Sequence, residues 1–344
     1  SLNNWHNRSL KVGTESTYWN CSNNMKHLTA LQDLFQAEVD QLNLGIAPTK
    51  LYDPMHYIMQ LGGKRLRPIL SLMGAGIYGD PSKAMPQAMA IELFHNFSLI
   101  HDDIMDAAPL RRGKTTVHKK WDDNVGILSG DGMLVKAYQY LAQCPPTVLP
   151  EVLETFSQTA LEVCEGQQMD MDFESMDDVA AATYIQMIQF KTSVLLGCAM
   201  KVGALVGGGS KKDADALYQF ALLLGTSFQI KDDYLDVYGD PEKFGKQVGG
   251  DILSNKKTLL WIEAQRRAAV QKIDFGAYAA MEPSEDKVHS FQELYKILGV
   301  DAYAKEQIDH YYELSLKALD PVDVPAEKLA PLKEFAAWLY SRES

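Results

Sequence analysis

Two acidic stretches decide the fold: HDDIMD at residues 101–106 and KDDYLD at residues 231–236. Both have the spacing Asp-Asp-x-x-Asp, and both lie within apolar sequence that has helical periodicity. Residues four apart on a helix stand one above the other, which pairs Asp102 with Asp106 and Asp232 with Asp236. Carboxylates so close together repel each other and lose solvation, so a cation must compensate them. Mg²⁺ binds one or two carboxylates and fills its octahedron with water and phosphate oxygens, and the stretches therefore predict a magnesium site.

A single Asp-Asp-x-x-Asp stretch is most often a solvated helix face or a charge cluster. Two copies, each flanked by apolar residues of its own helix, are much harder to explain in that way. The second copy therefore favours a binding site over a charged surface.

The composition bounds the class of protein. A chain of 344 residues can bury a sizeable core, and its net charge of -12 argues against a general nucleic-acid binder. The four cysteines lie far apart without a Cys-x-x-Cys pair, which favours reduced thiols and a cytoplasmic protein. We find no secretory signal and no apolar run near the ~20 residues that span a bilayer, so no transmembrane segment is expected.

Apolar residues recur at three- and four-residue spacing from Met25 onward, and glycine and proline breakers separate these runs. No run of alternating β-branched residues is bounded by hairpin turns. The pattern predicts helices near residues 25–43, 50–60, 67–78, 82–106, 121–143, 147–174, 178–206, 212–238, 255–269, 285–297, 301–319 and 327–341. We therefore expect one all-α domain over residues 25–344, a single large helical bundle with a central cavity between the facing aspartate-rich helices. Residues 1–24 are polar and without a period, and we expect an N-terminal extension outside the fold.

Two basic turns are candidates for anion binding. Arg111 and Arg112 follow the first acidic stretch, where a pair of guanidinium groups can clamp a diphosphate beside a carboxylate–metal cluster. The turn LGGKRLRP at residues 61–68 brings Lys64 and Arg67 close to the start of a helix, where an anion is stabilised. The chain has neither a P-loop nor a dinucleotide fingerprint, so these turns do not belong to either motif.

Other candidates are weaker when taken singly. His95 shares a helical stripe with Asp102 and Asp106, although a lone histidine on such a face is more often a core residue. Lys191 lies inside an apolar helix, where an ammonium group is costly unless an anion meets it. The loop at residues 239–257 adds further lysines, which are ordinarily solvated.

Together these motifs resemble the trans-isoprenyl diphosphate synthases of the polyprenyl synthetase family, of the short-chain type represented by geranylgeranyl and farnesyl diphosphate synthases. The matching segments follow the family's order from about residue 50 to residue 257. They are Gly-Gly-Lys-x-x-Arg at 62–67, the two aspartate stretches, Arg111-Arg112, Gly-Gln-x-x-Asp at 166–170, Lys191-Thr192, Phe-Gln-x-x-Asp-Asp at 228–233, Gly245-Lys246 and Asn255-Lys256.

The resemblance implies a prenyltransferase that joins isopentenyl diphosphate head-to-tail to an allylic diphosphate. The allylic substrate would be dimethylallyl, geranyl or farnesyl diphosphate, and the enzyme would be a homodimer. Mg²⁺ is the implied cofactor, with about three ions per active site. Loss of the allylic diphosphate develops negative charge, and metal ions and cationic side chains stabilise that charge.

The resemblance also assigns roles to individual residues. The implied metal ligands are Asp102, Asp106, Asp170 and Asp232, with Asp103, Asp233 and Asp236 supporting them. The residues implied to hold the allylic diphosphate are Arg111, Lys191, Lys246 and Lys256. Those implied to bind isopentenyl diphosphate are Gly63, Lys64, Arg67, His95 and Arg112. Thr192 and Gln229 would orient the allylic cation through their oxygens.

Product length is expected to depend on the residues that precede the first acidic stretch. In the family, aromatic residues both four and five positions before that stretch are typical of C15 synthases. Here Phe97 is aromatic but Ser98 is small, which opens the wall by about one isoprene unit, and Phe94 lies near the next turn down. We therefore predict a C20 product, with C15 as the next most favoured.

Two other classes remain as alternatives. A class I terpene cyclase also has an aspartate-rich helix in an all-α fold, but it needs no second diphosphate site. A non-catalytic regulatory subunit of a prenyl synthase would resemble the family, yet such subunits typically degrade one acidic motif, and both are intact here.

Overall fold

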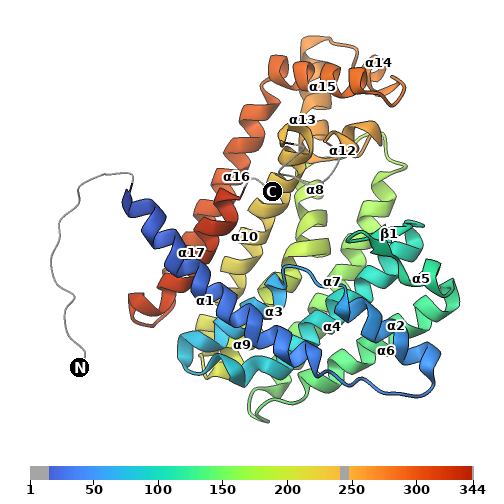
Figure 1. The fold of residues 1–344 in the computed structure, drawn as a ribbon. Coiled ribbons are helices and arrows are strands. Elements are labelled where there is room, and N and C mark those ends of the chain that lie inside the picture. The colour runs from blue at the N-terminus through green and yellow to red at the C-terminus, as the bar shows by residue number, and fades with distance from the viewer. Residues whose placement is uncertain (1–14, 241–247, 343–344) are drawn as a thin grey trace.

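The computed structural model describes residues 15–240 and 248–342, and the predicted all-α bundle is confirmed (Figure 1). Its longer helices agree closely with the predicted ranges. They are α1 (Glu15–Asp40), α2 (Thr49–Gln60), α3 (Leu66–Tyr78), α4 (Met85–Met105), α6 (Asp123–Leu141), α7 (Leu149–Phe173), α8 (Ala181–Ile188), α9 (Val194–Gly207), α10 (Lys211–Tyr238), α13 (Leu259–Gln271), α15 (Glu285–Leu298), α16 (Val300–Lys317) and α17 (Ala326–Ser341).

Helix α9 lies at the centre of the bundle, where it packs against α3, α7 and α10. Nearly all of its side chains are buried, because it is apolar on every face. Small residues let its neighbours approach closely: a Cβ atom at Gly203 would lie only 2.0 Å from the carbonyl oxygen of Ser71 in α3. The helix therefore gives the bundle a tightly packed axis against which the site-bearing helices are fixed.

The continuous helix Ala181–Gly207 is long and apolar enough to cross a bilayer, by length and composition alone. No such segment was expected from the sequence, because no uninterrupted apolar run approaches ~20 residues. In the structure 72% of its most apolar window is buried inside the bundle, which is the environment of a core helix.

Short elements that the periodicity did not predict complete the fold. They are η1 (Pro81–Ala84), α5 (Val117–Lys120), the π-turn η2 (Gln189–Ser193), α12 (Gly250–Leu253), α14 (Phe275–Ala279) and a hairpin of β1 (Leu110–Arg111) with β2 (Lys114–Thr115). The hairpin turns at Arg112 and Gly113, both at positive φ, as a two-residue hairpin loop requires.

Helix α1 begins at Glu15, earlier than the predicted start at residue 25. The last part of the expected N-terminal extension is therefore helical, and residues 1–14 lie outside the described residues. The division of the chain at residue 24 stays a prediction.

Candidate active site

The two acidic stretches face each other across one cavity of about 930 Å³. The first lies at the end of α4 and the second near the end of α10, and both helices pack against the central α9. Asp102 and Asp106 line the cavity from α4, while Asp232 and Asp236 line it from α10. The arrangement brings together the four carboxylates that the helical spacing paired.

The middle aspartate of each stretch is buried and bonded to a neighbouring element. Asp103 is buried and accepts two hydrogen bonds from Arg111, of 2.7 and 2.8 Å. Asp233 accepts a hydrogen bond from the Tyr184 hydroxyl, and burial raises its pKa to about 7 although the nearby Lys256 ammonium opposes that shift. Both contacts fix the walls of the site, and Asp233 also lines the cavity. The supporting role of these two residues stays a prediction.

Asp170 approaches the cavity indirectly. It is absent from the described lining of the cavity, and its carboxylate forms an ion pair of 2.6 Å with Lys191, which does line it. Burial raises the pKa of Asp102, and the nearby Lys191 ammonium opposes that shift. Lys191 thus joins the acidic stretch of α4 to the end of α7.

Lys191 and Thr192 both line the cavity from the π-turn η2, where the helix between α8 and α9 widens. Helix α7 packs directly on this turn at Gly166. A Cβ atom at Gly166 would lie 2.3 Å from the backbone nitrogen of Lys191 and 2.7 Å from the carbonyl carbon of Phe190. The first residue of the Gly-Gln-x-x-Asp motif is therefore a glycine because the turn leaves no room for a side chain.

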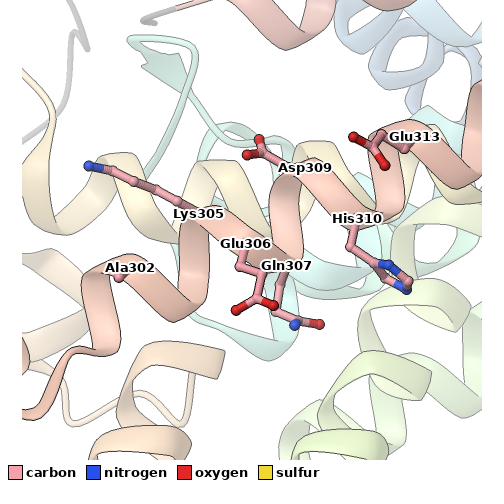
Figure 2. Close-up of a pocket in the computed structure, with 7 residues that line it drawn as sticks. All are labelled: Ala302, Lys305, Glu306, Gln307, Asp309, His310 and Glu313. Carbon is pink, nitrogen blue, oxygen red and sulfur yellow. The ribbon is translucent and has the colours of Figure 1, made fainter.

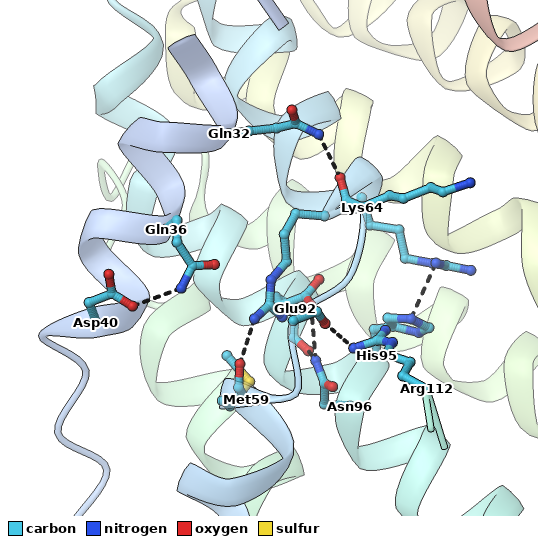
Figure 3. A network of polar contacts seen from close by, with 12 residues as sticks. Gln32, Gln36, Asp40, Met59, Lys64, Glu92, His95, Asn96 and Arg112 are labelled. Atoms are coloured by element: carbon cyan, nitrogen blue, oxygen red, sulfur yellow. Dashed lines mark hydrogen bonds and ion pairs between the residues drawn. The ribbon is translucent and has the colours of Figure 1, made fainter. Parts of the chain in front are cut away.

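A further wall of the cavity is basic, and Figure 3 shows Lys64, His95 and Arg112 of this basic wall. Arg67 donates from Nη1 to Nε2 of His95 at 3.3 Å, and Arg112 donates to the carbonyl oxygen of Gly62. Gly63 has φ +128°, and a Cβ atom there would lie 2.8 Å from Cζ of Arg112. The Gly-Gly pair therefore lets the turn close against this arginine. Lys64 also lines the wall, and its carbonyl accepts from Gln32 of α1 at 2.9 Å.

This wall concentrates positive charge. Burial and the nearby guanidinium groups lower the pKa of His95 well below its usual 6.5, so the imidazole is neutral and its Nε2 can accept the hydrogen bond from Arg67. Burial lowers the pKa of Arg67 as well, while the carboxylate of Glu92 opposes that shift. Such a cluster is suited to a multiply charged anion.

The depressed pKa of His95 predicts a pH effect on stability. Between its lowered folded pKa and about 6.5 only the unfolded chain binds the proton, so stability falls as the pH drops below about 6.5, by up to about 1.4 kcal/mol per pH unit. His95→Gln keeps an oxygen acceptor for Arg67 and removes this titration. Urea unfolding at about pH 7 and about pH 5 is expected to show a smaller loss of stability for the variant; an equal loss in both proteins contradicts the assignment.

Several lining residues were missed by sequence reasoning. Arg65 forms a buried ion pair with Glu92, which also accepts from Asn96 of α4 at 3.0 Å (Figure 3). Asp251 lines the cavity near Lys256, with 3.7 Å between its Oδ1 and the Lys256 Nζ. Arg65 lies inside the basic turn, so its charge could have marked it as a site residue. Glu92 is distant from every motif in the sequence, and no local pattern pointed to it.

The remaining predicted residues divide as follows. Thr192, Gln229 and Lys256 line the cavity, whereas Lys246 lies outside the described residues.

The residues predicted to set product length lie on α4. Ser98 lines the cavity, and its hydroxyl donates to the carbonyl oxygen of His95 at 2.8 Å. Phe94 is buried below, with its ring 5.4 Å from Phe97 and 5.3 Å from Phe156 of α7. Phe94 and Phe97 therefore belong to an aromatic layer behind the described lining.

The donor set fits Mg²⁺ only together with a substrate. Among the described residues no three carboxylate, histidine or cysteine side chains converge on one metal position. Asp102 and Asp106 instead offer carboxylates at one end of the cavity and Asp232 and Asp236 at the facing end. This fits an ion that takes one or two carboxylates and completes its shell with water and phosphate oxygens.

A second hollow lies along the outer face of α16 (Figure 2). Its described lining comes from this helix alone and mixes both signs of charge, through Lys305, Glu306, Asp309, His310 and Glu313. These side chains point in different directions rather than toward one point, so we assign no site there.

Comparison with known proteins defines the class. The polyprenyl synthetase family model matches residues 48–298. The chain is 38% identical to geranylgeranyl diphosphate synthase of Methanosarcina mazei, over 89% of this chain and 94% of the relative. A geranylgeranyl pyrophosphate synthetase structure from Pyrococcus horikoshii Ot3 superposes with a TM-score of 0.84 at 32% identity, covering 93% of this chain and 99% of the other. The chain belongs to the polyprenyl synthetase family, as the motifs indicated.

The relatives narrow the class further. The chain is also 33% identical to geranylfarnesyl diphosphate synthase of Natronomonas pharaonis, over 83% of this chain and 86% of the relative. The protein is a prenyltransferase of the short-chain type, and the two alternative classes are not favoured.

Proposed function

We propose that the protein condenses isopentenyl diphosphate with an allylic diphosphate to give an all-trans C20 diphosphate. One observation carries the proposal: a single cavity is lined both by the two facing acidic stretches and by a cluster of basic side chains. An acidic wall binds a diphosphate through metal ions, whereas a basic wall binds one directly. Two diphosphates can therefore be held at once, and a condensation requires both.

The allylic diphosphate would lie on the acidic wall. Asp102, Asp106, Asp170 and Asp232 would together hold about three Mg²⁺ ions. These ions would neutralise charge on the leaving diphosphate. Lys191 and Lys256 would hold the same group from the protein side. The C1–O bond then breaks with its electron pair leaving on the diphosphate, and the oxygens of Thr192 and Gln229 would stabilise the allylic cation.

Isopentenyl diphosphate would lie on the basic wall, held by Lys64, Arg67 and Arg112. Neutral His95 accepts from Arg67 and so keeps that guanidinium group in place. The C4 carbon of the alkene attacks the allylic cation and forms the new C–C bond. The proton lost from C2 goes to the departed diphosphate, so no side-chain base is required.

Incubation with geranyl diphosphate and labelled isopentenyl diphosphate tests the function. We expect Mg²⁺-dependent incorporation of label, stopped by EDTA, with geranylgeranyl diphosphate as the main product. A protein that consumes an allylic diphosphate without isopentenyl diphosphate would be a cyclase. One that consumes neither would be non-catalytic, and either result overturns the proposal.

Ser98 should control product length. It lines the cavity above the aromatic layer of Phe94, Phe97 and Phe156. Ser98→Phe would fill the space for about one isoprene unit, so the main product should shift from C20 to C15. Chromatography of the dephosphorylated products measures the shift. The control variant is Ser157→Ala, beside Tyr138, which should leave the product length unchanged. An unchanged product length removes Ser98 from the wall.

We also propose a homodimer, without a transmembrane helix and located in the cytoplasm. Exposed apolar side chains gather on two consecutive helices, α6 and α7: Ile127, Leu128, Val135, Leu153 and Leu161. Tyr138 and Phe156 join these helices with ring centroids 5.1 Å apart, which supports a common surface. Sedimentation of the native protein should give twice the chain mass. Val135→Asp places a charge on the apolar surface and should lower the measured mass toward that of one chain. A native protein that sediments as a monomer contradicts the proposal.

A further inference from the structure

A buried lysine outside the cavity holds the segment that carries Lys256. Lys287, in α15, is only 1% exposed, and its ammonium group donates three hydrogen bonds. The acceptors are Oδ1 of Asn255 at 2.8 Å and the carbonyl oxygens of Ala279 and Met281, each at 3.0 Å. All three N–H donors of the ammonium are thus satisfied by neutral oxygens.

Asn255 is the residue on which the direction of Lys256 depends. It has φ +53°, in the left-handed region, directly after α12. Its N–H donates to the carbonyl oxygen of Ile252 at 3.1 Å. The N–H of Lys256 donates to the carbonyl oxygen of Asp251 at 2.9 Å. This is the Schellman arrangement, in which one left-handed residue reverses the chain at a helix end. Lys256 is therefore aimed by the conformation of Asn255.

The side chain of Asn255 is held at both ends. Its Oδ1 accepts from Lys287, and its Nδ2 donates to the carbonyl oxygen of Ala279 at 3.2 Å. A non-glycine residue in the left-handed region is disfavoured by about 1–2 kcal/mol, less for asparagine, so these contacts oppose a return to right-handed backbone. Figure 1 shows α14 and α15 beyond α12, at the end of the molecule that carries this segment.

Lys256 itself lies among carboxylates. It lines the cavity, and the carboxylates of Asp251, Asp233 and Asp170 raise its pKa above the usual value although burial alone would lower it. A small change in the direction of this side chain would pair it fully with an aspartate and withdraw it from the substrate.

We propose that Lys287 is a positioning residue for prenyl transfer: through Asn255 it aims Lys256 at the diphosphate of the allylic substrate. The inference rests on the proposed function, because that function makes Lys256 a ligand of the allylic diphosphate. The contact acts on one substrate only, since the basic wall that would bind isopentenyl diphosphate is built from the turn before α3, from α3 and α4, and from the β1–β2 turn.

Steady-state kinetics of Lys287→Met with each substrate varied separately tests the proposal. We expect KM for geranyl diphosphate to rise about tenfold, as loss of a hydrogen-bonded anchor predicts, with KM for isopentenyl diphosphate changed less than about twofold. Lys201→Met is the matched control, because Lys201 is also largely buried and bridges Glu151 at 2.8 Å and Asp215 at 2.7 Å outside the described cavity lining. It should lower the melting temperature without changing either KM.

A second variant keeps the test valid if Lys287→Met does not fold. Asn255→Ala leaves Lys287 with both carbonyl acceptors and should raise KM for geranyl diphosphate alone, by about five- to tenfold. Where both single variants fold, the double variant should show little further increase, because both changes remove one contact. Equal changes in the two KM values, or fully additive effects, overturn the proposal. Failure of the native protein to incorporate label would instead refute the proposed function.

Discussion

Asp102→Asn is expected to lower kcat for prenyl transfer by about 10³-fold and to raise the Mg²⁺ concentration needed for half-maximal rate. The variant keeps the shape of the side chain but removes one of the charges that would hold metal against the leaving diphosphate. Metal-assisted charge stabilisation contributes several kcal/mol to such a step, and each 1.4 kcal/mol is about tenfold in rate. Initial rates over a Mg²⁺ titration measure both effects.

Asp172→Asn is the matched control for this experiment. Asp172 is an exposed aspartate of α7 that accepts from Gln168 at 2.8 Å and is absent from the described cavity lining. The same chemical change there should leave the rate and the Mg²⁺ dependence within about twofold. If Asp102→Asn keeps native turnover and native Mg²⁺ dependence, the acidic wall is not the metal site.

Gly166→Ala is expected to lower kcat by about 10²-fold and to destabilise the fold by about 1–3 kcal/mol. The added Cβ would meet backbone atoms of Phe190 and Lys191, which cannot rotate away as the tip of a side chain can. Helix α7 or the π-turn η2 must move, and Lys191 and Thr192 move with it. A displacement near 1 Å in a catalytic group costs about 10²-fold in rate. Single-turnover rates and urea unfolding measure the two effects.

Gly132→Ala separates this effect from helix propensity. Gly132 is also inside a long helix, but a Cβ there would meet the Cε end of Met55 at 2.4 Å, which can rotate away. Both variants gain the same intrinsic helix preference for alanine. Native activity and stability are expected for Gly132→Ala. If Gly166→Ala also kept native activity and stability, α7 would not position the turn.

Much of the fold was predictable because helix ends coincide with local signals. Ser210 and Ser284 accept hydrogen bonds from the first turns of α10 and α15, and each directly follows a glycine or a proline in the sequence. The acidic pairs were also predictable, since i and i+4 positions share a face whatever the helix packs against. The all-α bundle and the two aspartate pairs that line the cavity follow from these short-range rules.

The parts that escaped prediction depend on contacts between distant segments. The π-turn at Lys191 has no local signal, because it exists where α7 closes on the helix through Gly166. The pairing of Arg65 with Glu92 required knowing that α3 and α4 are neighbours. The contacts of the buried Asp103 and Asp233 could not be read from spacing alone, because their partners Arg111 and Tyr184 lie on other elements.

The β1–β2 turn has a consequence for how two parts of the cavity wall move. Arg111 is bound to Asp103 beneath the acidic wall, while the next residue, Arg112, is bound to Gly62 of the basic wall. Two neighbouring residues of one tight turn are thus each anchored to a different side of the cavity. Asp103 of α4 and the turn before α3 are therefore linked through a single peptide unit, and a movement of one is passed on to the other.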